Sequence, residues 1–430
     1  MPTRPRHLPR AAAGLAVLAL VGCGSDTGGG STTSTSTPAS STSPSASSSA
    51  SSSSSSTASS SSSPRTSSSS STSASTTAAG PKASSCVSGV RDAMTSTQQA
   101  GQLLMAAMQP GSPTGLDSAI SQQALGSMLY LGGWQGSSTV AAASSHLQEV
   151  SPTVNGTKVG MLVSADQEGG EVQQLTGSGF TSLPSGLEQA QDPQLRTSAK
   201  AWGSELKQAG VNVNLAPVAD TVPAAIGRAN QPIGKWGRQY GSTPAAAGKG
   251  ALAFAQGMQD AGVEPTVKHF PGIGRITGNT DLTATGISDT VATTNDPHLA
   301  PFAQNIKGGT RIVMVGSAHY PKIDGETPAL FSKKIVTGML RDDMGFDGVA
   351  ITDDVGAAKA VSATPVGQRA TKFIAAGGDI VLTADPAQVS TMVSAIQTKA
   401  KGDPAFAKQV TASVTRVLTL KEDMGLLRCG

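Results

Sequence analysis

The sequence predicts an α/β protein, a (β/α)8 TIM barrel, over the part of the chain that begins at Cys86. Short apolar runs rich in β-forming residues alternate eight times with segments of helical periodicity. Several runs are continuously apolar, which is typical of parallel strands buried on both faces. About 340 residues are available, and such a barrel needs about 250 plus insertions. A doubly wound open sheet is the alternative that the same alternation allows.

The elements follow one another at regular spacing. The expected strands are Leu103–Met108, Ser127–Leu131, Val159–Ser164, Val211–Leu215, Val263–Val267, Ile312–Val315, Val349–Thr352 and Ile380–Leu382. The expected helices include Pro193–Ala209, Thr243–Ala261, Lys333–Asp343, Thr364–Ala376 and Val389–Lys401. Gly210, Gly262, Gly345 and Gly377 stand where helix C-caps are expected, because glycine readily adopts the left-handed conformation found there.

The first 22 residues have the composition of a signal peptide. A basic beginning with Arg4, Arg6 and Arg10 precedes an apolar run that is too short to span a bilayer. The run ends in small residues followed by Cys23, which resembles a bacterial lipobox and predicts diacylation of Cys23. We therefore expect a lipid-anchored protein on the extracytoplasmic face of the membrane. An ordinary secretory signal with an incidental cysteine is the alternative.

Residues 23–85 consist almost wholly of Ser, Thr, Ala, Gly and Pro. Such a segment cannot bury enough apolar surface to offset the entropy of ordering, so we expect a disordered tether. Its r.m.s. span would be about 45 Å, and its composition permits O-glycosylation. The expected organisation is thus a signal peptide (1–22), a lipidated tether (23–85) and one catalytic domain (86–430).

The remaining two cysteines stand at the two ends of that domain. An exported protein meets oxidising conditions, and the termini of a domain often lie close together. We therefore expect a disulfide between Cys86 and Cys429, with two unpaired thiols as the alternative.

The net charge of +3 at pH 7 gives no argument for nucleic-acid binding. We expect a monomer that needs no metal and no cofactor.

Polar residues gather where the expected strands end. They are Asp166, Asn214, Asp220, Lys268, His269, His319, Asp353 and Asp354. In a barrel, this is the end that carries the active site. The stretch from Val267 to Asp281 is the most informative, because Lys268 and His269 precede a loop rich in glycine. Lysine is almost never buried unpaired, so Lys268 indicates either function or a structural ion pair.

These motifs occur in a specific order along the chain. They are Asp166-Gln-Glu-Gly-Gly170, Asn212-Val-Asn-Leu-Ala-Pro-Val-Ala-Asp220, Arg238-Gln-Tyr-Gly241, Lys268-His-Phe-Pro-Gly-Ile-Gly274, Ala318-His319 and Gly348-Val-Ala-Ile-Thr-Asp-Asp354. Together they resemble glycoside hydrolase family 3, in particular its NagZ-like β-N-acetylglucosaminidase branch. The resemblance covers the chain from about Cys86 onward.

The resemblance implies that Asp353 is the nucleophile of a retaining glycosidase and forms a covalent glycosyl-enzyme. Only one of Asp353 and Asp354 can point inward, because successive strand residues face opposite ways. Asp354 would then support Asp353 or cap a helix, and the structural alternative for Asp353 is also a helix cap.

The proton donor departs from the family pattern. The matching loop in the NagZ-like branch ends in Asp-Ser-His, but this chain has no histidine between Gly272 and Val291. Alignment from Lys268 without gaps places Asn279-Thr280-Asp281 there. We infer that Asp281 is the acid/base and that Asn279 is its hydrogen-bonding neighbour. This requires a raised pKa for Asp281, for example near Asp353, and Arg275 would oppose it. The alternatives are that Asp281 caps the loop, that His319 or another group donates the proton, or that catalysis is slow.

Substrate contacts follow from the resemblance. Asp166, Arg238, Lys268, His269 and His319 are expected to bind the sugar, whereas Asn214 and Asp220 either order the barrel rim or touch it. Glu171 stands where the family often has arginine.

The expected function is exo-acting hydrolysis of terminal N-acetylglucosamine from cell-wall peptidoglycan fragments. A family 3 β-glucosidase, a glycoside phosphorylase and a catalytically impaired muropeptide-binding lipoprotein are the alternatives.

Overall fold

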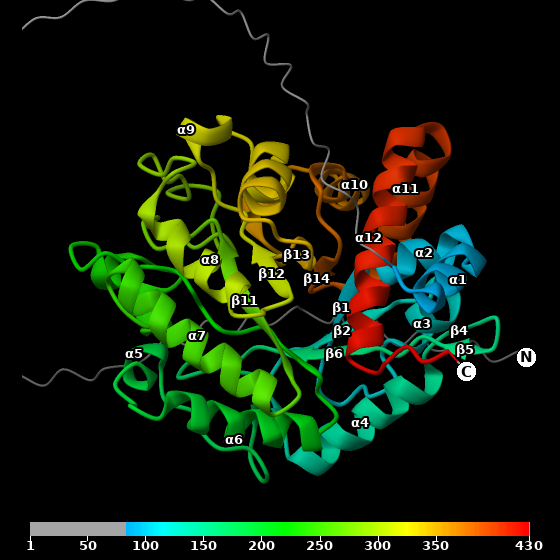
Figure 1. The fold of residues 1–430 in the computed structure, drawn as a ribbon, viewed down its shortest axis with the longest axis horizontal. Coiled ribbons are helices and arrows are strands. Elements are labelled where there is room, and N and C mark those ends of the chain that lie inside the picture. Colours follow the sequence, from blue (N-terminus) through cyan, green and yellow to red (C-terminus); the bar gives the residue numbers. More distant parts are fainter. Residues whose placement is uncertain (1–82, 430) are drawn as a thin grey trace, which may run out of the picture. The chain divides into compact units, whose positions relative to one another are not determined.

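A computed structural model of the chain describes residues 83–429. The main sheet has eight strands. They are β1 (Leu104–Met108), β2 (Ser127–Tyr130), β6 (Leu162–Ala165), β10 (Val213–Asn214), β11 (Glu264–Phe270), β12 (Ile312–Val315), β13 (Val349–Thr352) and β14 (Val381–Thr383). They pair in parallel in the order β13-β12-β11-β10-β6-β2-β1-β14 (Figure 1).

The two outer strands of this order meet and close the sheet. Ile351 of β13 forms a parallel bridge with Ile380, the residue before β14. The backbone N–H of Thr352 donates to the Ile380 carbonyl at 3.0 Å, and that of Val355 donates to the Leu382 carbonyl at 3.0 Å. The predicted (β/α)8 class is therefore confirmed, and the open doubly wound sheet is wrong.

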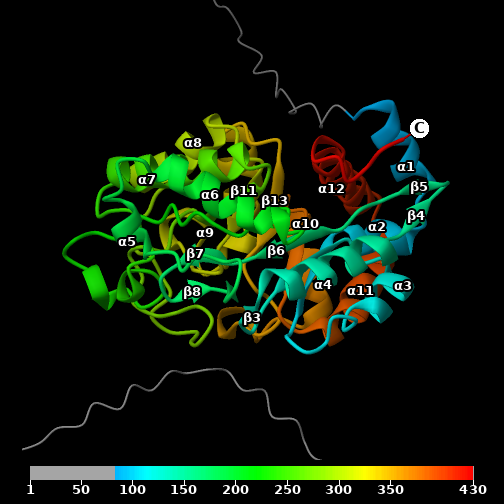
Figure 2. The same cartoon turned by 90° about the horizontal axis from the view of Figure 1, so that it is seen from below.

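A helix follows each strand and lies outside the barrel (Figures 1 and 2). These helices are α3 (Asp117–Gln123), α4 (Ser137–Val150), α6 (Leu195–Gln208), α7 (Pro244–Asp260), α8 (Ala300–Lys307), the π-helix η5 (Lys334–Asp343), α10 (Val366–Ala376) and α11 (Val389–Gly402). Two helices, α1 (Ser85–Ala93) and α2 (Ser96–Gln102), precede β1, and α12 (Pro404–Asp423) follows α11. No helix in the described range of 83–429 is long and apolar enough to cross a membrane.

All eight expected strands are present, and β12 and β13 have the predicted boundaries. Every residue of the eight strands is buried, as parallel strands covered on both faces should be. The four glycines expected at helix C-caps all have positive φ, from 66° at Gly345 to 107° at Gly377.

Three local expectations need correction. Strand β6 begins at Leu162 rather than Val159, because Val159 instead forms an antiparallel bridge with Leu427. Strand β11 extends to Phe270, so Lys268 and His269 belong to the strand and not to the loop after it. The helix expected at residues 333–343 is a π-helix.

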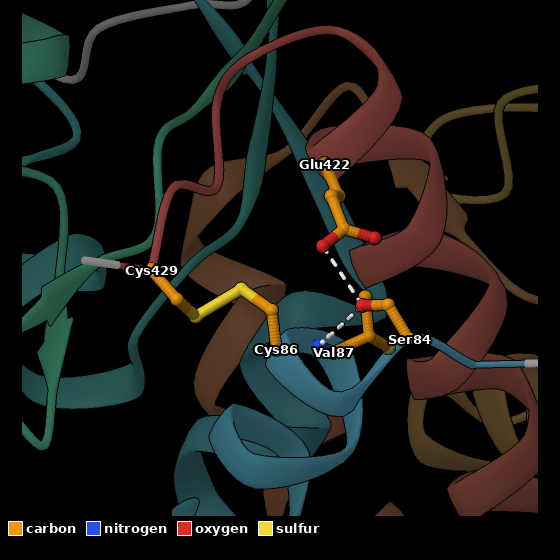
Figure 3. The surroundings of a disulfide bond; sticks show 5 residues. All are labelled: Ser84, Cys86, Val87, Glu422 and Cys429. Atoms are coloured by element: carbon orange, nitrogen blue, oxygen red, sulfur yellow. Dashed lines mark hydrogen bonds between the residues drawn. A yellow bond between two sulfur atoms is a disulfide. The ribbon is translucent and has the colours of Figure 1, made fainter.

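The two ends of the domain are joined covalently. Cys86 and Cys429 form a disulfide with their Cα atoms 5.8 Å apart (Figure 3). Ser84 caps α1 by accepting a hydrogen bond from the Val87 N–H at 3.0 Å, and its hydroxyl donates to Glu422 at 2.8 Å. The first turn of the domain is thus held against the end of α12. The expected signal peptide, Cys23 and the tether up to residue 82 lie outside the described residues.

Replacing both Cys86 and Cys429 by serine is expected to lower the free energy of unfolding. The bridge closes a loop with a sequence separation of 343 residues, for which the chain-entropy model gives at most about 5 kcal/mol. Thermal unfolding with and without reductant measures the effect. The wild-type protein should lose stability when reduced, whereas the double variant should not respond. Equal melting temperatures for the oxidised wild type and the variant would contradict the stabilising role.

Candidate active site

A cavity of about 350 Å³ lies at the carboxyl ends of the strands. It brings together eight of the residues that the sequence analysis singled out. They are Asp166, Arg238, Lys268, His269, Asn279, Asp281, Asp353 and Asp354. Strand direction explains why these residues meet, because Asp166 follows β6, Lys268 and His269 lie near the end of β11, and Asp353 follows β13.

One wall of the cavity is a network of buried charges. Lys268 is only 2% exposed, and its Nζ lies 2.5 Å from both Asp166 Oδ1 and Glu168 Oε1. Arg238 donates from Nε and Nη2 to the two carboxylate oxygens of Glu168, each at 2.8 Å. The ion pair that the sequence allowed for Lys268 is therefore present, and Lys268 also lines the cavity.

Glu168 is the central member of this network and was missed by the sequence analysis. Burial would raise the pKa of its carboxyl, but the charges of Arg238 and Lys268 lower that pKa to about 2. A sequence signal existed, because Glu168 stands two residues after Asp166 and alternate residues of an extended chain share a face. Gly169, at φ 104°, lets the chain turn here, since a Cβ at this position would lie 2.2 Å from the Pro184 carbonyl oxygen.

Asn214 orders this wall and does not line the cavity. Its side-chain oxygen accepts a hydrogen bond from the Gln167 N–H, and its amide donates to the Gln167 carbonyl, both at 3.1 Å. Gln167 stands between Asp166 and Glu168, so this clamp fixes the backbone that carries both carboxylates. Asn214 was expected either to order the barrel rim or to touch the sugar, and these hydrogen bonds favour the first role.

Asp220 has a similar supporting position. It is fully buried, and its carboxylate lies 2.7 Å from Nδ1 of His269. It also accepts a hydrogen bond from the Ile273 N–H at 2.7 Å. Because Nδ1 of His269 faces Asp220, the other ring nitrogen, Nε2, is the one left for a ligand. Asp220 thus orients a cavity residue and does not itself line the cavity.

His319 lies outside the cavity, contrary to its expected contact with substrate. Its backbone N–H donates to the Ile287 carbonyl at 3.0 Å, and its carbonyl accepts from the Asp289 N–H at 2.9 Å. Its Nδ1 lies 3.6 Å from the exposed Glu326. These contacts join two loops at the barrel end, so His319 is held in a structural position.

The two consecutive carboxylates after β13 differ in their surroundings. Asp354 accepts backbone N–H bonds from Gly356 at 2.8 Å, Ala357 at 2.9 Å and Ala384 at 2.7 Å. It therefore ties the loop after β13 to the loop after β14. Asp353 accepts through Oδ1 only the Asp354 N–H, at 2.9 Å, and within residues 83–429 no donor reaches its Oδ2. Asp353 is thus the carboxylate with an oxygen available in the cavity.

Asp281 reaches the cavity on a loop that is closed at its base. The N–H groups of Thr277 and Gly278 donate to the Gly286 carbonyl at 3.1 and 2.8 Å. A Cβ on Gly278 would lie 2.2 Å from the Thr285 carbonyl oxygen, so this close approach requires glycine. Asn279 accepts the Asp281 backbone N–H at 2.9 Å. It therefore shapes the turn, and this hydrogen bond does not involve the Asp281 carboxyl.

The tip of the same loop is docked beside the Asp353 segment. The N–H groups of Lys359 and Ala360, in the 3-10 helix η6 (Lys359–Val361), donate to the carbonyls of Asp281 and Thr280 at 3.2 and 3.0 Å. Helix η6 follows β13 in the chain. Two backbone hydrogen bonds thus hold the Asp281 loop against the segment that follows Asp353.

The surroundings of Asp281 favour its protonated form. Asp281 as a whole residue is exposed to solvent, but its carboxyl lines the cavity, where the surrounding protein and the charges of Asp353 and Asp354 raise its pKa to about 7. Arg238 and His269 oppose this shift. Arg275, the residue expected to oppose it, is paired instead with Asp289 at 3.2 Å and Asp296 at 2.8 Å.

This arrangement has the parts of an acid/base and nucleophile pair. A carboxyl whose pKa is raised toward neutrality faces the same cavity as a second carboxylate with a free oxygen, and such separation of roles is typical of glycosidases. No group of three or more His, Cys, Asp or Glu in the described part of the chain is arranged to hold a metal ion.

The chain is similar to known proteins in sequence and in structure. The chain is 33% identical to a β-hexosaminidase of Xanthomonas axonopodis pv. citri over 246 residues, which cover 55% of this chain and 71% of that protein. Its structure resembles a β-N-acetylhexosaminidase from Beutenbergia cavernae, with a TM-score of 0.72, 39% identity and coverage of 76% of this chain and 99% of that one. It also resembles LpqI of Mycobacterium tuberculosis, with a TM-score of 0.67, 25% identity and coverage of 79% and 97%. Residues 95–420 match the family described as glycosyl hydrolase family 3 N terminal domain, and since they make up most of the chain, this protein belongs to glycosyl hydrolase family 3.

Proposed function

We propose that this protein is an exo-acting, retaining β-N-acetylglucosaminidase that releases terminal N-acetylglucosamine from cell-wall glycan fragments. The observation that carries the proposal is that Asp281, with its raised pKa, and Asp353, with a free oxygen, face one cavity. The similarity to proteins named β-hexosaminidase and β-N-acetylhexosaminidase supports the choice of sugar.

The mechanism follows from the two carboxyl groups. Asp353 attacks the anomeric carbon while Asp281 gives its proton to the departing glycosidic oxygen, which leaves a glycosyl ester on Asp353 and a carboxylate at Asp281. Ester formation removes the charge of Asp353, so the pKa of Asp281 falls and the residue becomes a base. Asp281 then takes a proton from the water that attacks the ester, and the sugar is released with its original configuration.

The cavity walls suit the end of a glycan chain. The buried network of Lys268, Glu168 and Arg238 holds Asp166 beside the cavity, where its carboxylate can accept hydrogen bonds from sugar hydroxyls. Nε2 of His269 supplies a further polar contact. Beneath them the barrel is filled with side chains, as in other proteins of this fold. A terminal sugar can enter such a site, whereas the middle of a chain would have to pass through the barrel.

Two alternatives are less consistent with the geometry. A phosphorylase would bring phosphate to the ester beside the carboxylates of Asp281 and Asp354, where like charges repel it. The alternative of a binding protein without catalysis was supported by two features, the altered donor loop and Glu171. The loop, however, still presents a carboxyl to the cavity, and Glu171 is exposed and does not line it.

The test compares nitrophenyl β-N-acetylglucosaminide with nitrophenyl β-glucoside, with and without phosphate. We expect kcat/KM to be at least about tenfold higher for the acetamido sugar, with free N-acetylglucosamine as the product. Faster hydrolysis of the glucoside would indicate a β-glucosidase, and formation of a sugar phosphate would indicate a phosphorylase. Saturable sugar binding without turnover would indicate a binding protein.

We also propose that the enzyme acts outside the cytoplasm, anchored by a lipid on Cys23. The basic and apolar composition of residues 1–22 supports this. In the native host, Cys23→Ala should move the protein from the membrane fraction to the medium. Retention of that variant in the membrane fraction would contradict lipid anchoring.

A further inference from the structure

Three large exposed apolar side chains among residues 83–429 belong to residues at or next to the cavity wall. Large apolar residues left exposed among residues 83–429 include Leu187 (41%), Trp236 (40%), Leu282 (66%) and Val291 (57%). Trp236 lines the cavity. Leu282 directly follows Asp281, and the Leu187 N–H donates to the carbonyl of Gly237, the residue after Trp236, at 3.0 Å. Exposed apolar surface beside a polar site is typical of ligand contact.

Trp236 stands on a turn that is fixed on both sides. It ends the 3-10 helix η2 (Gly234–Trp236), which Gly237 terminates in the left-handed conformation at φ 65°. The buried Asn230 accepts the Gly234 N–H at 2.7 Å and donates to the carbonyls of Ile273 and Ile276 at 2.8 and 2.7 Å. Arg238, two residues further on, is paired with Glu168. The indole therefore projects from a rigid support that is joined to the loop after β11.

One face of the indole is already occupied. Nζ of Lys235 lies 4.6 Å from the ring centroid, which is the geometry of a cation–π contact. Part of the residue is open to solvent, since it is 40% exposed. Tryptophan has the largest apolar surface of any side chain, and a rigidly held, partly exposed indole in a cavity wall can stack on a flat ligand surface.

The exposed fractions of the cavity side chains show on which side of the scissile bond Trp236 lies. The polar residues that would hold the terminal sugar are nearly inaccessible, with Lys268 at 2% and His269 at 4% exposure. Trp236 and Leu282 are far more exposed and therefore lie toward the mouth. Leu282 is also adjacent to Asp281, the group that protonates the departing oxygen. The part of the substrate beyond that oxygen must leave the cavity past these side chains.

We propose that Trp236 is the stacking platform for the sugar ring that follows the scissile bond, with Leu282 at its edge. A β-linked pyranose presents axial C–H groups that match the electron-rich face of an indole. The inference rests on the proposed function and extends it to the leaving group: the enzyme selects substrates in which that group is another pyranose.

The test compares kcat/KM for two substrates that share the terminal sugar. N,N′-diacetylchitobiose has a pyranose as leaving group, whereas β-N-acetylglucosaminyl fluoride has no ring there. Trp236→Ala should lower kcat/KM for the disaccharide by about 10- to 100-fold, a loss in the range expected for one aromatic contact. The loss of kcat/KM that Trp236→Ala causes for the fluoride should be at least tenfold smaller. Trp236→Phe should recover most of the activity on the disaccharide. Val291→Ala, which removes an exposed apolar side chain outside the cavity, is the matched control and should behave as wild type.

Equal losses on both substrates would overturn the inference, because Trp236 would then contact the terminal sugar or position Arg238. Absence of any loss would overturn it as well. If Trp236→Ala does not fold, Trp236→Leu, which keeps an apolar side chain but has no aromatic ring, takes its place on the same two substrates, and equal losses on both would overturn the stacking role. An inactive wild-type enzyme would overturn the proposed function together with this inference, whereas an active one with equal losses overturns the inference alone.

Discussion

Asp353→Ala is expected to lower kcat for nitrophenyl β-N-acetylglucosaminide by about 10⁴-fold or more, because it removes the nucleophile of the reaction. No neighbouring carboxylate can take its place. Asp354 is immediately adjacent, but three backbone N–H groups occupy its oxygens and hold it in the loop. Steady-state kinetics at saturating substrate measures the loss. Asp92→Asn, a change of an exposed carboxylate on α1 that is absent from the cavity, is the control and should leave kcat unchanged.

A second measurement identifies the bond that forms. A fluorinated sugar that slows breakdown of the intermediate should label the wild-type enzyme, and mass spectrometry of the digested protein should find the sugar on Asp353. The Asp353→Ala variant should remain unlabelled. Label on Asp166, Asp281 or Asp354, or a variant that turns over at the wild-type rate, would show that the nucleophile has been misassigned.

Asp281→Asn should have an effect that depends on the leaving group. For N,N′-diacetylchitobiose, whose departing oxygen needs a proton, we expect kcat/KM to fall by about 10²- to 10⁴-fold. For a dinitrophenyl glycoside, whose leaving group departs without a proton, the fall in kcat/KM should be much smaller. Azide should accelerate turnover of that activated substrate by the variant, because an anionic nucleophile can attack the ester without the help of a base.

The pH dependence provides an independent check on Asp281. The first step requires a protonated Asp281, so kcat/KM of the wild type should decline as the pH rises through about 7, the value to which its pKa is raised. Asp281→Asn carries no proton that can be lost and should not show this decline. A variant that keeps the same alkaline decline, or that hydrolyses chitobiose at the wild-type rate, would exclude Asp281 as the acid.

Local features of the sequence were enough to predict the architecture of the barrel. Strands β12 and β13 were predicted to the residue, since an unbroken apolar run is itself the pattern of a parallel strand buried on both faces. The helix ends before Gly210, Gly262, Gly345 and Gly377 could be predicted because a positive φ is a property of one residue type at one position. The end of β11 was missed, because Lys268 and His269 are not apolar and only their buried partners allow them to remain in a strand.

The sequence by itself determined the barrel and the order of its elements, because these depend on backbone preference and on apolar periodicity along the chain. The resemblance of its motifs to glycoside hydrolase family 3 identified eight of the residues that line the cavity. Only the tertiary structure decided which charges lie together. Glu168 with Arg238, Asp220 with His269, and Asp281 with Asp353 come from segments far apart in the sequence. Coulomb energies and pKa values depend on distances through space and on burial, and neither can be read from the spacing of residues along the chain. For the same reason His319 could not be excluded, and Trp236 could not be recognised, before the loops were folded around the cavity.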